Sequence, residues 1–381
     1  MMKARVILWD MDGKGKKWLE ENIHGDRIEL VQIIPSYEKN VQLVNDDIDL
    51  LLIANEVIDI TIIQMLERVG FGSDRVVFLY SLNSWYDKFD QAAFLMKDQV
   101  GGMRRLLFWR HECCAKDYCS CRVEGLTFIA SVKDKVIMPT MMRDGQIWSA
   151  GEMRLFYKLA HEYYVLRDDE PGYFLDLGAN IGTTGIYFRK KLDMNMEIIA
   201  FEPNDNNNKL LQINLLLNGL AGEAYAESYG LSDRRENRQL YYDENNPGGT
   251  SLVKNSGGMT AEVPLISLDE YFEESGLDDA RIKYIWIDTE GFEPFVVGGA
   301  MNILKKRAIP LYMEFNPYLW NKQGHLQTMA DCLREAGYTR YILIQEYMEG
   351  RKEIWPVDSL VAFKDAGPNF QRDIFLIKGN T

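Results

Sequence analysis

The stretch Phe174-Leu175-Asp176-Leu177-Gly178-Ala179-Asn180-Ile181-Gly182 decides the fold of this 381-residue chain. An apolar strand ends in an acid, and a glycine-rich turn then opens a helix that we expect to run through Lys191. Glycines let a ligand approach the backbone, and the helix N-terminus offers free N–H groups. The dinucleotide-binding pattern would need a glycine where Asn180 stands. The stretch therefore predicts a smaller, zwitterionic ligand, and a plain tight turn is the alternative.

A second acid follows the next predicted strand. The run Ile198-Ile199-Ala200-Phe201-Glu202-Pro203 places Glu202 24 positions after Gly178, near the spacing of ~20 for an acid that hydrogen-bonds ribose hydroxyls. Open α/β sheets bind ligands at the carboxyl ends of their strands. The two motifs together predict a nucleoside-containing ligand at one edge of a parallel sheet.

A third run is rich in carboxylates. Asp288, Glu290 and Glu293 follow the apolar strand 284–287 within six residues, and Glu314 ends the strand after it. By sheet topology these acids share one rim of the sheet. The alternative is a helix N-terminus, where the dipole favours acids.

Four ordered blocks resemble the FkbM family of S-adenosylmethionine (SAM)-dependent methyltransferases. They are FLDLGANIGTTGIYF, AFEPNDNNNKLLQINLLLN, VPLISLDEYF and IWIDTEGFEPFVVGGA, and they span roughly residues 170–320. The resemblance implies an α/β fold, a class I SAM-methyltransferase Rossmann-like seven-stranded sheet that binds SAM. It also implies O-methylation of a sugar, glycan or polyketide-type hydroxyl.

The resemblance assigns roles to individual residues. SAM would contact the turn and the strand ends, with the methionyl part on the turn, the ribose on Glu202 beside Pro203, and the adenine near Leu231. The methionyl part would contact the turn residues Asp176, Gly178, Asn180 and Gly182. The adenine would lie near Ser232 and Asp233, which follow Leu231. The acids that would face the reacting centre are Asp288, Glu290 and Glu293.

A hydroxyl is a weak nucleophile, so we expect a general base or a metal to assist it. None of the four histidines lies in the four blocks, so carboxylates are the better candidates, with Glu290 and Glu293 ahead of Glu314. His325 could overhang the pocket from a loop, or could be an exposed loop residue. Alternatively, Asp288, Glu290 and Glu314 could hold Mg²⁺ through oxygen ligands.

The segment 245–251 has small polar side chains and turn-forming residues, and such loops above a sheet rim often bind substrate. An exposed turn is the alternative. The residues expected to contact the acceptor are Asn246, Gly248, Gly249, Thr250, Glu314 and Asn316.

The chain is predicted to have two domains and a connector. Residues 1–95 alternate strands and helices, including a helix at 58–69, as a smaller Rossmann-like α/β domain. Residues 96–150 are a connector that returns to β structure from Thr127 to Met138, and 151–381 form the methyltransferase domain, whose third strand is expected from Ala224 to Gly230. The N-terminal turn has Gly13 and Gly15 but Trp18 where a third glycine would stand, so we interpret it as a degenerate module that docks a partner or substrate. Two alternatives remain: a nucleotide-sugar oxidoreductase using this module, and a non-catalytic SAM-binding scaffold.

The amino-acid composition of the chain limits the classes of ligand that we expect it to bind. The net charge of −14 and pI near 4.9 make nucleic acid and anionic lipid unlikely ligands, and no apolar run is long enough to span a membrane. The start of the chain does not resemble a signal peptide, so we expect a cytoplasmic protein with a small-molecule or glycan acceptor and a possible homo-oligomer. Cys113, Cys114, Cys119 and Cys121 fit no common zinc spacing, and reduced cysteines are the main interpretation over a metal site.

Overall fold

The computed structural model describes residues 4–10, 13, 15–22, 28–35, 48–54, 76–78, 118–134, 136–167, 169–241, 250–253 and 260–379. The chain divides into two compact units, which we describe separately. The first comprises Met1–Cys119 with Pro139–Gly145, and the second Ser120–Met138 with Gln146–Thr381. The predicted domain limits at residues 95 and 150 stay predictions. No helix among the described residues is long and apolar enough to cross a membrane.

The first unit contains a parallel sheet with the strand order β2-β1-β3-β4. Val6 to Trp9 in β1 are fully buried, as expected for a parallel strand covered on both faces. The strands and the first helix predicted here are present, whereas the helix predicted at 58–69 lies outside the described residues. The elements are β1 (Ala4–Asp10), α1 (Gly15–Asn22), β2 (Ile28–Ile34), β3 (Leu50–Ala54) and β4 (Val76–Phe78).

The turn between β1 and α1 is occupied by a carboxylate of the chain itself. The two oxygens of Asp10 accept hydrogen bonds from the backbone N–H groups of Gly15 (2.9 Å) and Lys16 (3.0 Å). These first N–H groups of a helix are the ones that would bind a phosphate. Asp10 therefore fills the position that a dinucleotide would need.

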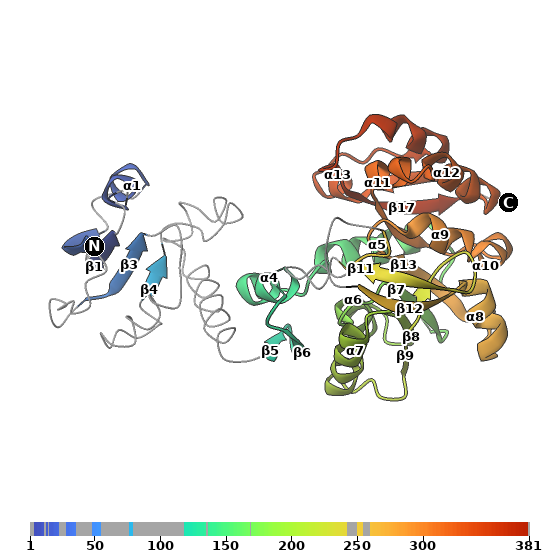
Figure 1. Cartoon of the computed structure of the whole chain (residues 1–381), viewed down its shortest axis with the longest axis horizontal. Coiled ribbons are helices and arrows are strands. Elements are labelled where there is room, and N and C mark those ends of the chain that lie inside the picture. Colours follow the sequence, from blue (N-terminus) through green and yellow to red (C-terminus); the bar gives the residue numbers. More distant parts are fainter. Residues whose placement is uncertain are drawn as a thin grey trace. The chain divides into compact units, whose positions relative to one another are not determined.

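The second unit is built on a sheet with the order β16-β15-β17-β14-β13-β7-β8-β9 (Figure 1). The strands from β14 to β9 are parallel, and β17 lies antiparallel between β14 and β15. The seven-stranded sheet expected from the sequence is present, and the short edge strand β16 is an eighth. The strands are β7 (Gly172–Leu177), β8 (Met196–Phe201), β9 (Ala224–Glu227), β13 (Ile282–Ile287), β14 (Leu311–Phe315), β15 (Tyr338–Leu343), β16 (Trp355–Pro356) and β17 (Arg372–Lys378).

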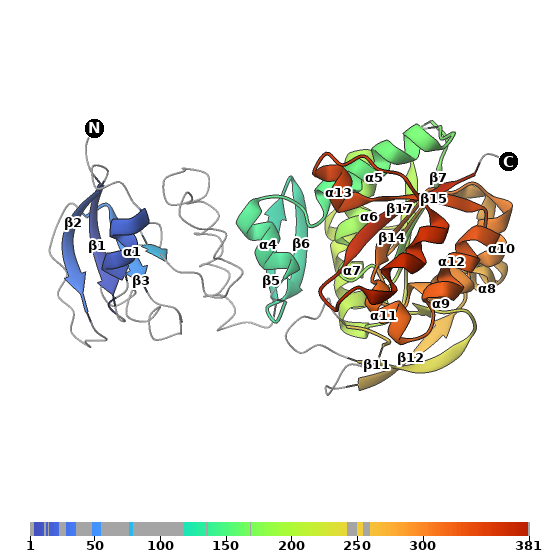
Figure 2. The same cartoon turned by 90° about the horizontal axis from the view of Figure 1, so that it is seen from above.

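Helices cover both faces of this sheet (Figure 2). Because side chains alternate along a strand, Tyr173, Leu175 and Leu177 of β7 enter one hydrophobic core, while Phe174 stacks on Phe188 on the other face. Residues of α8, α9, α10, α11 and α12 complete the first core. Their bounds are Leu268–Ser275, Glu293–Gly298, Met301–Lys306, Pro317–Lys322 and Leu326–Glu335.

The opposite face is covered by three helices. Phe156 of α5 (Ala150–Tyr163) packs edge-on against Tyr284 and Phe375 of the sheet. The helix after the glycine turn, α6 (Thr183–Tyr187), continues as a π-helical turn from Phe188 to Leu192. The third helix is α7 (Asp205–Leu217), which begins after the N-cap residue Asn204.

Two predicted strands differ from the structure. The strand expected from Thr127 to Met138 is instead β6 (Leu126–Ser131), because Asp134 accepts the N–H groups of residues 136–138 and starts α4 (Ile137–Asp144). The strand expected from Ala224 to Gly230 divides into β9 and β10 (Gly230–Leu231). Within the described part of the insertion, β10 joins β11 (Glu236–Tyr241) and β12 (Thr260–Ile266) in a separate three-stranded sheet.

Candidate active site

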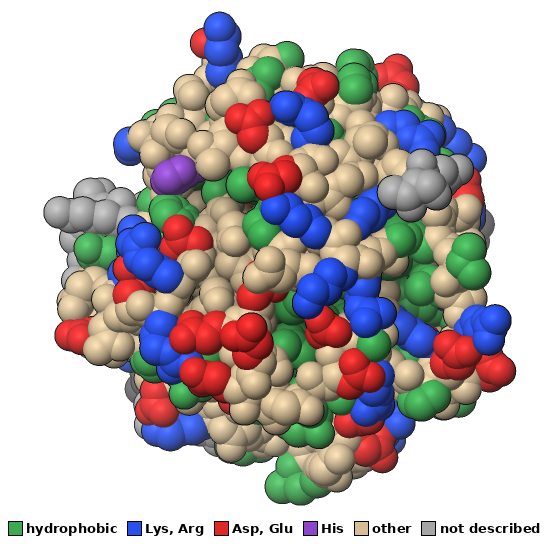
Figure 3. Space-filling model, turned by 90° about the vertical axis from the view of Figure 1, so that its right-hand side faces the viewer, with side chains coloured by type: hydrophobic (Ala, Val, Ile, Leu, Met, Phe, Trp, Pro, Cys, Tyr) green, Lys and Arg blue, Asp and Glu red, His purple; other side chains and the backbone are tan. Residues whose placement is uncertain are grey.

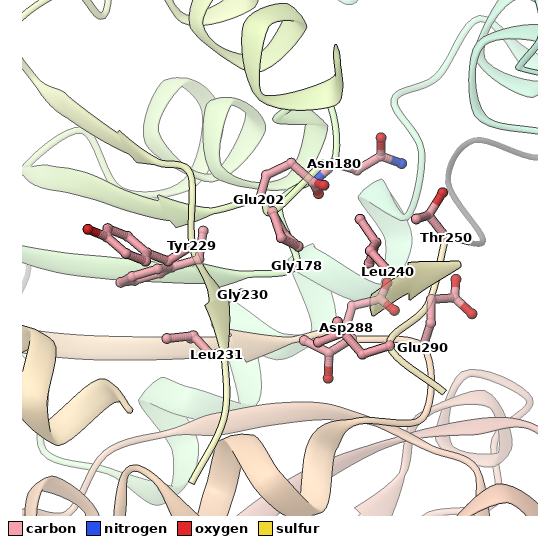
Figure 4. Close-up of a pocket in the computed structure, with 14 residues that line it drawn as sticks. Gly178, Asn180, Glu202, Tyr229, Gly230, Leu231, Leu240, Thr250, Asp288 and Glu290 are labelled. Atoms are coloured by element: carbon pink, nitrogen blue, oxygen red, sulfur yellow. The ribbon is translucent and has the colours of Figure 1, made fainter. Parts of the chain in front are cut away.

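A pocket with about 550 Å³ of empty space lies at the carboxyl ends of β7, β8 and β13 (Figure 4). Glu202 and Asn180 lie on one side and Asp288 and Glu290 on another. Leu231, Leu240 and Leu252 give it an apolar wall. We call it the first pocket.

Gly178 allows the turn to approach the neighbouring strand. Its φ is 95°, and a Cβ built there would lie 1.9 Å from the backbone oxygen of Asp288. The backbone N–H groups of Gly178 and Ala179 both donate to the carbonyl of Phe201. Only glycine fits this position, and the turn is fixed between β8 and β13.

Glu202 connects the turn to the second predicted motif. Its two carboxylate oxygens accept backbone N–H groups of Asn180 and Asn204, each at 2.8 Å. Burial is the main cause that raises the pKa of Glu202 to about 7, although these hydrogen bonds oppose it. A carboxylate offers about four acceptor sites, so two remain for hydroxyl groups in the first pocket.

Asp176 lies beneath the turn, 1 % exposed, and lines neither pocket of the site. Its Oδ2 accepts the backbone N–H of Gly185 at 2.9 Å. Burial raises the pKa of Asp176 to about 7. The placement supports a role in holding the turn and α6 rather than direct contact with a ligand.

A second pocket, with about 930 Å³ of empty space open to solvent, adjoins the first. The two share Gly178, Asn180, Asp288 and Glu290 as lining residues. The rings of Trp286 and Tyr312, neighbours on β13 and β14, stack with centroids 3.5 Å apart. This larger pocket therefore combines an aromatic wall with carboxylates.

Asp288 and Glu290 lie where the two pockets meet. The Asp288 side chain is exposed to the pocket, and protein atoms surround its other sides. Desolvation by this surrounding protein is the main cause that raises the pKa of Asp288 well above the usual value, and the charge of Glu290 is the second. Glu290 has φ 53°, and the Ser251 hydroxyl donates to its backbone carbonyl at 2.8 Å. These two carboxylates are thus placed between a first and a second ligand.

Unusual backbone conformations concentrate here. Four described residues other than glycine have a positive φ, and Ser149, Asn180 and Glu290 among them line the second pocket. Such conformations cost about 1–3 kcal/mol each and cluster at functional sites. These unusual backbone conformations thus occur at the same site that the sequence motifs predict.

Glu293 is differently placed from its two neighbours. It is fully buried and lines neither pocket. Its Oε1 accepts from the backbone and hydroxyl of Thr289 and from the backbone of Gly291, and its Oε2 accepts from the Trp320 indole at 2.9 Å. This placement gives the predicted catalytic role of Glu293 no support and indicates that Glu293 organises the 288–293 loop.

His325 and Asn316 also lie away from the pocket linings. The His325 ring packs on Phe295 with centroids 4.6 Å apart, so the structure does not support an overhanging histidine. Asn316 caps α11 by accepting the N–H of Leu319. These positions give no support to the predicted catalytic role of His325 or to the predicted contact of Asn316 with the acceptor.

The remaining predicted residues divide between lining and supporting positions. Pro203 and Thr250 line the first pocket, and Glu314 lines the second. Gly182, Ser232 and Asp233 line neither, and Gly182 instead caps α6 close to Leu211. The predicted substrate residues Asn246, Gly248 and Gly249 lie outside the described residues.

Sequence reasoning missed several lining residues. Trp286 and Tyr312 lie inside apolar strands, whose pattern does not distinguish a pocket wall from core. Asp373 was detectable, because an acid at the start of an antiparallel strand lies at the same rim as acids that end parallel strands. The other missed residues include Tyr229, Leu240, Leu252 and Gln371.

Metal ligands do not gather in the part of the chain that is described: it contains no group of three or more His, Cys, Asp or Glu side chains that could hold an ion. Cys119 is buried and Cys121 half-buried, and the other two members of the predicted cluster lie outside the described residues.

The strand order and the position of the pockets define the class of this fold. A parallel sheet whose last strands include one antiparallel insertion, with ligand pockets at its carboxyl edge, is the Rossmann-like methyltransferase architecture. Residues 176–340 match the family profile described as "Methyltransferase FkbM domain". The chain therefore contains an FkbM-family methyltransferase domain.

Individual relatives are consistent with this assignment. Methyltransferase sdnD of Sordaria araneosa is 29% identical over 167 residues, which cover 36% of this chain and 64% of that protein. The match thus spans just under two thirds of the relative's length.

Solved structures of low similarity include methyltransferase FkbM from Methylobacillus flagellatus KT, at 13% identity and TM-score 0.32 over 98% of this chain and 90% of that one. TYW2 of M. jannaschii, solved in complex with AdoMet, has 13% identity and TM-score 0.33 over 68% of this chain and 85% of that one. TM-scores this low support no argument, and the fold is identified by its strand order.

Proposed function

We propose that this protein is a SAM-dependent methyltransferase that transfers a methyl group to a hydroxyl of a sugar, glycan or polyketide-type acceptor. The main observation is the pair of adjoining pockets that share Asp288 and Glu290. A group-transfer enzyme needs its two substrates side by side with the reacting atoms in line. The first pocket, next to the glycine turn and Glu202, is the one proposed for SAM.

The residues of the first pocket fit SAM. The free acceptor sites of Glu202 suit two ribose hydroxyls, and the leucine wall suits an adenine ring. Asp288 and Glu290 face the side where the positive charge of the cofactor would lie. When bound, SAM would supply an electrophilic methyl group on its sulfonium.

The second pocket is proposed to hold the acceptor. Trp286 and Tyr312 stack on each other and, although only 3 % and 2 % exposed, contribute an aromatic part to its wall. Asp288 or Glu290 would accept the hydroxyl proton as the oxygen lone pair forms the new bond to carbon. A raised pKa, as burial gives to Asp288, suits a base that works near neutral pH.

Calorimetry with SAM and with NAD tests the cofactor, and formation of S-adenosylhomocysteine with glycan acceptors tests turnover. We expect Asp288→Asn or Glu290→Gln to lose turnover by roughly 10²–10⁴-fold, a larger effect than the weakening of SAM binding in the same variant. Loss of activity in EDTA and its return with Mg²⁺ would indicate a metal instead. Near-native turnover in both variants would refute the catalytic assignment.

The alternatives lead to different results. An oxidoreductase would bind NAD at the β1–α1 turn, which is disfavoured because Asp10 already occupies its N–H groups. A SAM-binding scaffold would bind SAM without turnover. We also keep the sequence-based proposals of a cytoplasmic location, of a possible homo-oligomer, and of no nucleic-acid partner. On the face drawn in Figure 3, Lys and Arg lie among Asp and Glu.

A further inference from the structure

We propose that the acceptor carries a protonated amine or similar organic cation, which Glu314 and Asp373 bind in the second pocket. This inference rests on the proposed function, because it names the chemistry of the acceptor in that site. Four observations support it: the position of the two acids, an unpaired oxygen, the charge of the pocket, and the division of that charge between two ligands.

Glu314 and Asp373 are directly opposite residues on neighbouring antiparallel strands, β14 and β17. Side chains in this position have Cβ atoms about 4.5–5.5 Å apart, and like charges there destabilise the sheet. Both side chains line the second pocket. The pair is therefore unfavourable by itself and would become favourable with a cation between or beside its members.

The hydrogen bonds of the pair are incomplete. Glu314 is 3 % exposed, and its Oε1 accepts from the Gln371 amide, whereas its Oε2 has no hydrogen-bond partner in the structure. A buried acceptor without a partner costs about 1–3 kcal/mol. Asp373, by contrast, accepts from the Gln345 amide at 2.6 Å. One buried oxygen at the pocket thus lacks a donor, and an ammonium group offers three.

The charge of the pocket has one sign. Its described lining residues include Asp288, Glu290, Glu314 and Asp373, and they include neither Lys nor Arg. Burial, with the neighbouring acids adding to it, raises the pKa of Glu314 well above its usual value, and burial raises that of Asp373 to about 6. Glu314 and Asp373 thus have no compensating Lys or Arg among the described residues that line this pocket.

The cofactor accounts for only part of this charge. Asp288 and Glu290 line both pockets, so the positive charge of SAM would lie beside them, whereas Glu314 and Asp373 line only the second pocket. An amine held there stays protonated and has no lone pair to accept a methyl group. A hydroxyl elsewhere on the same acceptor, facing Asp288 or Glu290, remains the nucleophile.

D-Glucosamine and D-glucose are matched probes, because at one carbon D-glucosamine carries an ammonium group where D-glucose carries a hydroxyl. We would measure their binding to the full chain by ligand-observed NMR near pH 7, with N-acetylglucosamine as a neutral amide of the same sugar. Wild-type protein should bind glucosamine at least tenfold more tightly than either neutral sugar. Glu314→Gln and Asp373→Asn should each reduce this preference about tenfold, whereas Asp331→Asn, on an exposed helix position, should not change it.

Equal binding of the three sugars, or binding of none, would overturn the proposal. Mg²⁺ that binds the wild type and competes with glucosamine through Glu314 would overturn it in favour of a metal site. SAM binding, measured separately on the same protein, keeps the two proposals apart: its failure removes the methyltransferase assignment, and a selective response to glucosamine would still stand.

Discussion

The close approach of Gly178 to β13 gives a prediction with a matched control. In Gly178→Ala, the new methyl group would lie 1.9 Å from the Asp288 carbonyl oxygen, against about 3.4 Å for ordinary contact. The loop and the strand would have to separate by roughly 1.5 Å, next to the hydrogen bond from the Asp288 N–H to the Leu177 carbonyl (2.9 Å). The substitution therefore adds a clash to the strain of a positive φ.

Gly222→Ala separates the two effects. Gly222 also has a positive φ, 81°, but nothing lies within 4 Å of the position that a methyl group would take there. This control should be destabilised only by the left-handed strain of about 1–2 kcal/mol. Gly178→Ala should be destabilised by that strain and by the loss of a buried backbone hydrogen bond, about 1–3 kcal/mol more, together about 2–5 kcal/mol.

Thermal unfolding and SAM calorimetry measure the two consequences. At about 2–4 °C per kcal/mol for a domain of this size, Gly178→Ala should lower the Tm by roughly 4–20 °C and by more than the control, which should lose roughly 2–8 °C. SAM binding should be lost only in Gly178→Ala, at a temperature where both variants are folded. Equal Tm shifts, with SAM binding kept in both, would refute the argument that this turn is held by contact with β13.

Three further predictions concern the buried acids. Glu202→Gln should raise the SAM dissociation constant about tenfold to a hundredfold, since charge-assisted hydrogen bonds contribute roughly 1.5–3 kcal/mol; calorimetry showing an unchanged constant would make Glu202 purely structural. Because burial raises the pKa of Asp176 from 3.8 to about 7, its stabilising effect is complete below pH 3.8 and lost as the pH rises through 7. Asp176→Asn should therefore flatten the pH dependence of the Tm over this window, and an unaltered slope would contradict the shift. Glu293→Gln should lower the Tm and alter Trp320 fluorescence while SAM affinity in the folded variant stays near native; a large loss of turnover without loss of stability would restore Glu293 as a catalytic group.

Much of the methyltransferase sheet could be predicted because its signals are local. An apolar run with an acid at or near its end locates β7, β8 and β13, and a glycine turn directly follows the first of them. The boundaries that failed depend on single side chains or distant partners. Asp134 ends the β-structure before α4 by capping its N–H groups, and Gly230 leaves β9 to pair with β12.

The site was predictable only in outline for the same reason. Acids at strand ends were visible, but sequence spacing could not tell that Glu290 faces the pockets while Glu293, three residues later, turns inward to Trp320. The chain turns between these two acids, with a positive φ at both Glu290 and Gly291. Asp373 becomes part of the site only through antiparallel pairing with Glu314, a contact between residues far apart in the chain.

Two asparagines of α7 take the place of a neighbouring strand beside β6. The Asn214 side chain bonds both the N–H and the C=O of Ile129, and the Asn218 side chain does the same for Thr127. Four residues along a helix rise about 6 Å, and two residues along a strand rise about 6.8 Å. The spacing of Asn214 and Asn218 on the helix therefore nearly matches the spacing of Thr127 and Ile129 on the strand, and each side-chain amide lies opposite one backbone residue. This edge of β6 is thereby closed to strand addition by another chain, a common route to aggregation. A helix that presents amides every fourth residue can thus protect an exposed strand without becoming part of a sheet.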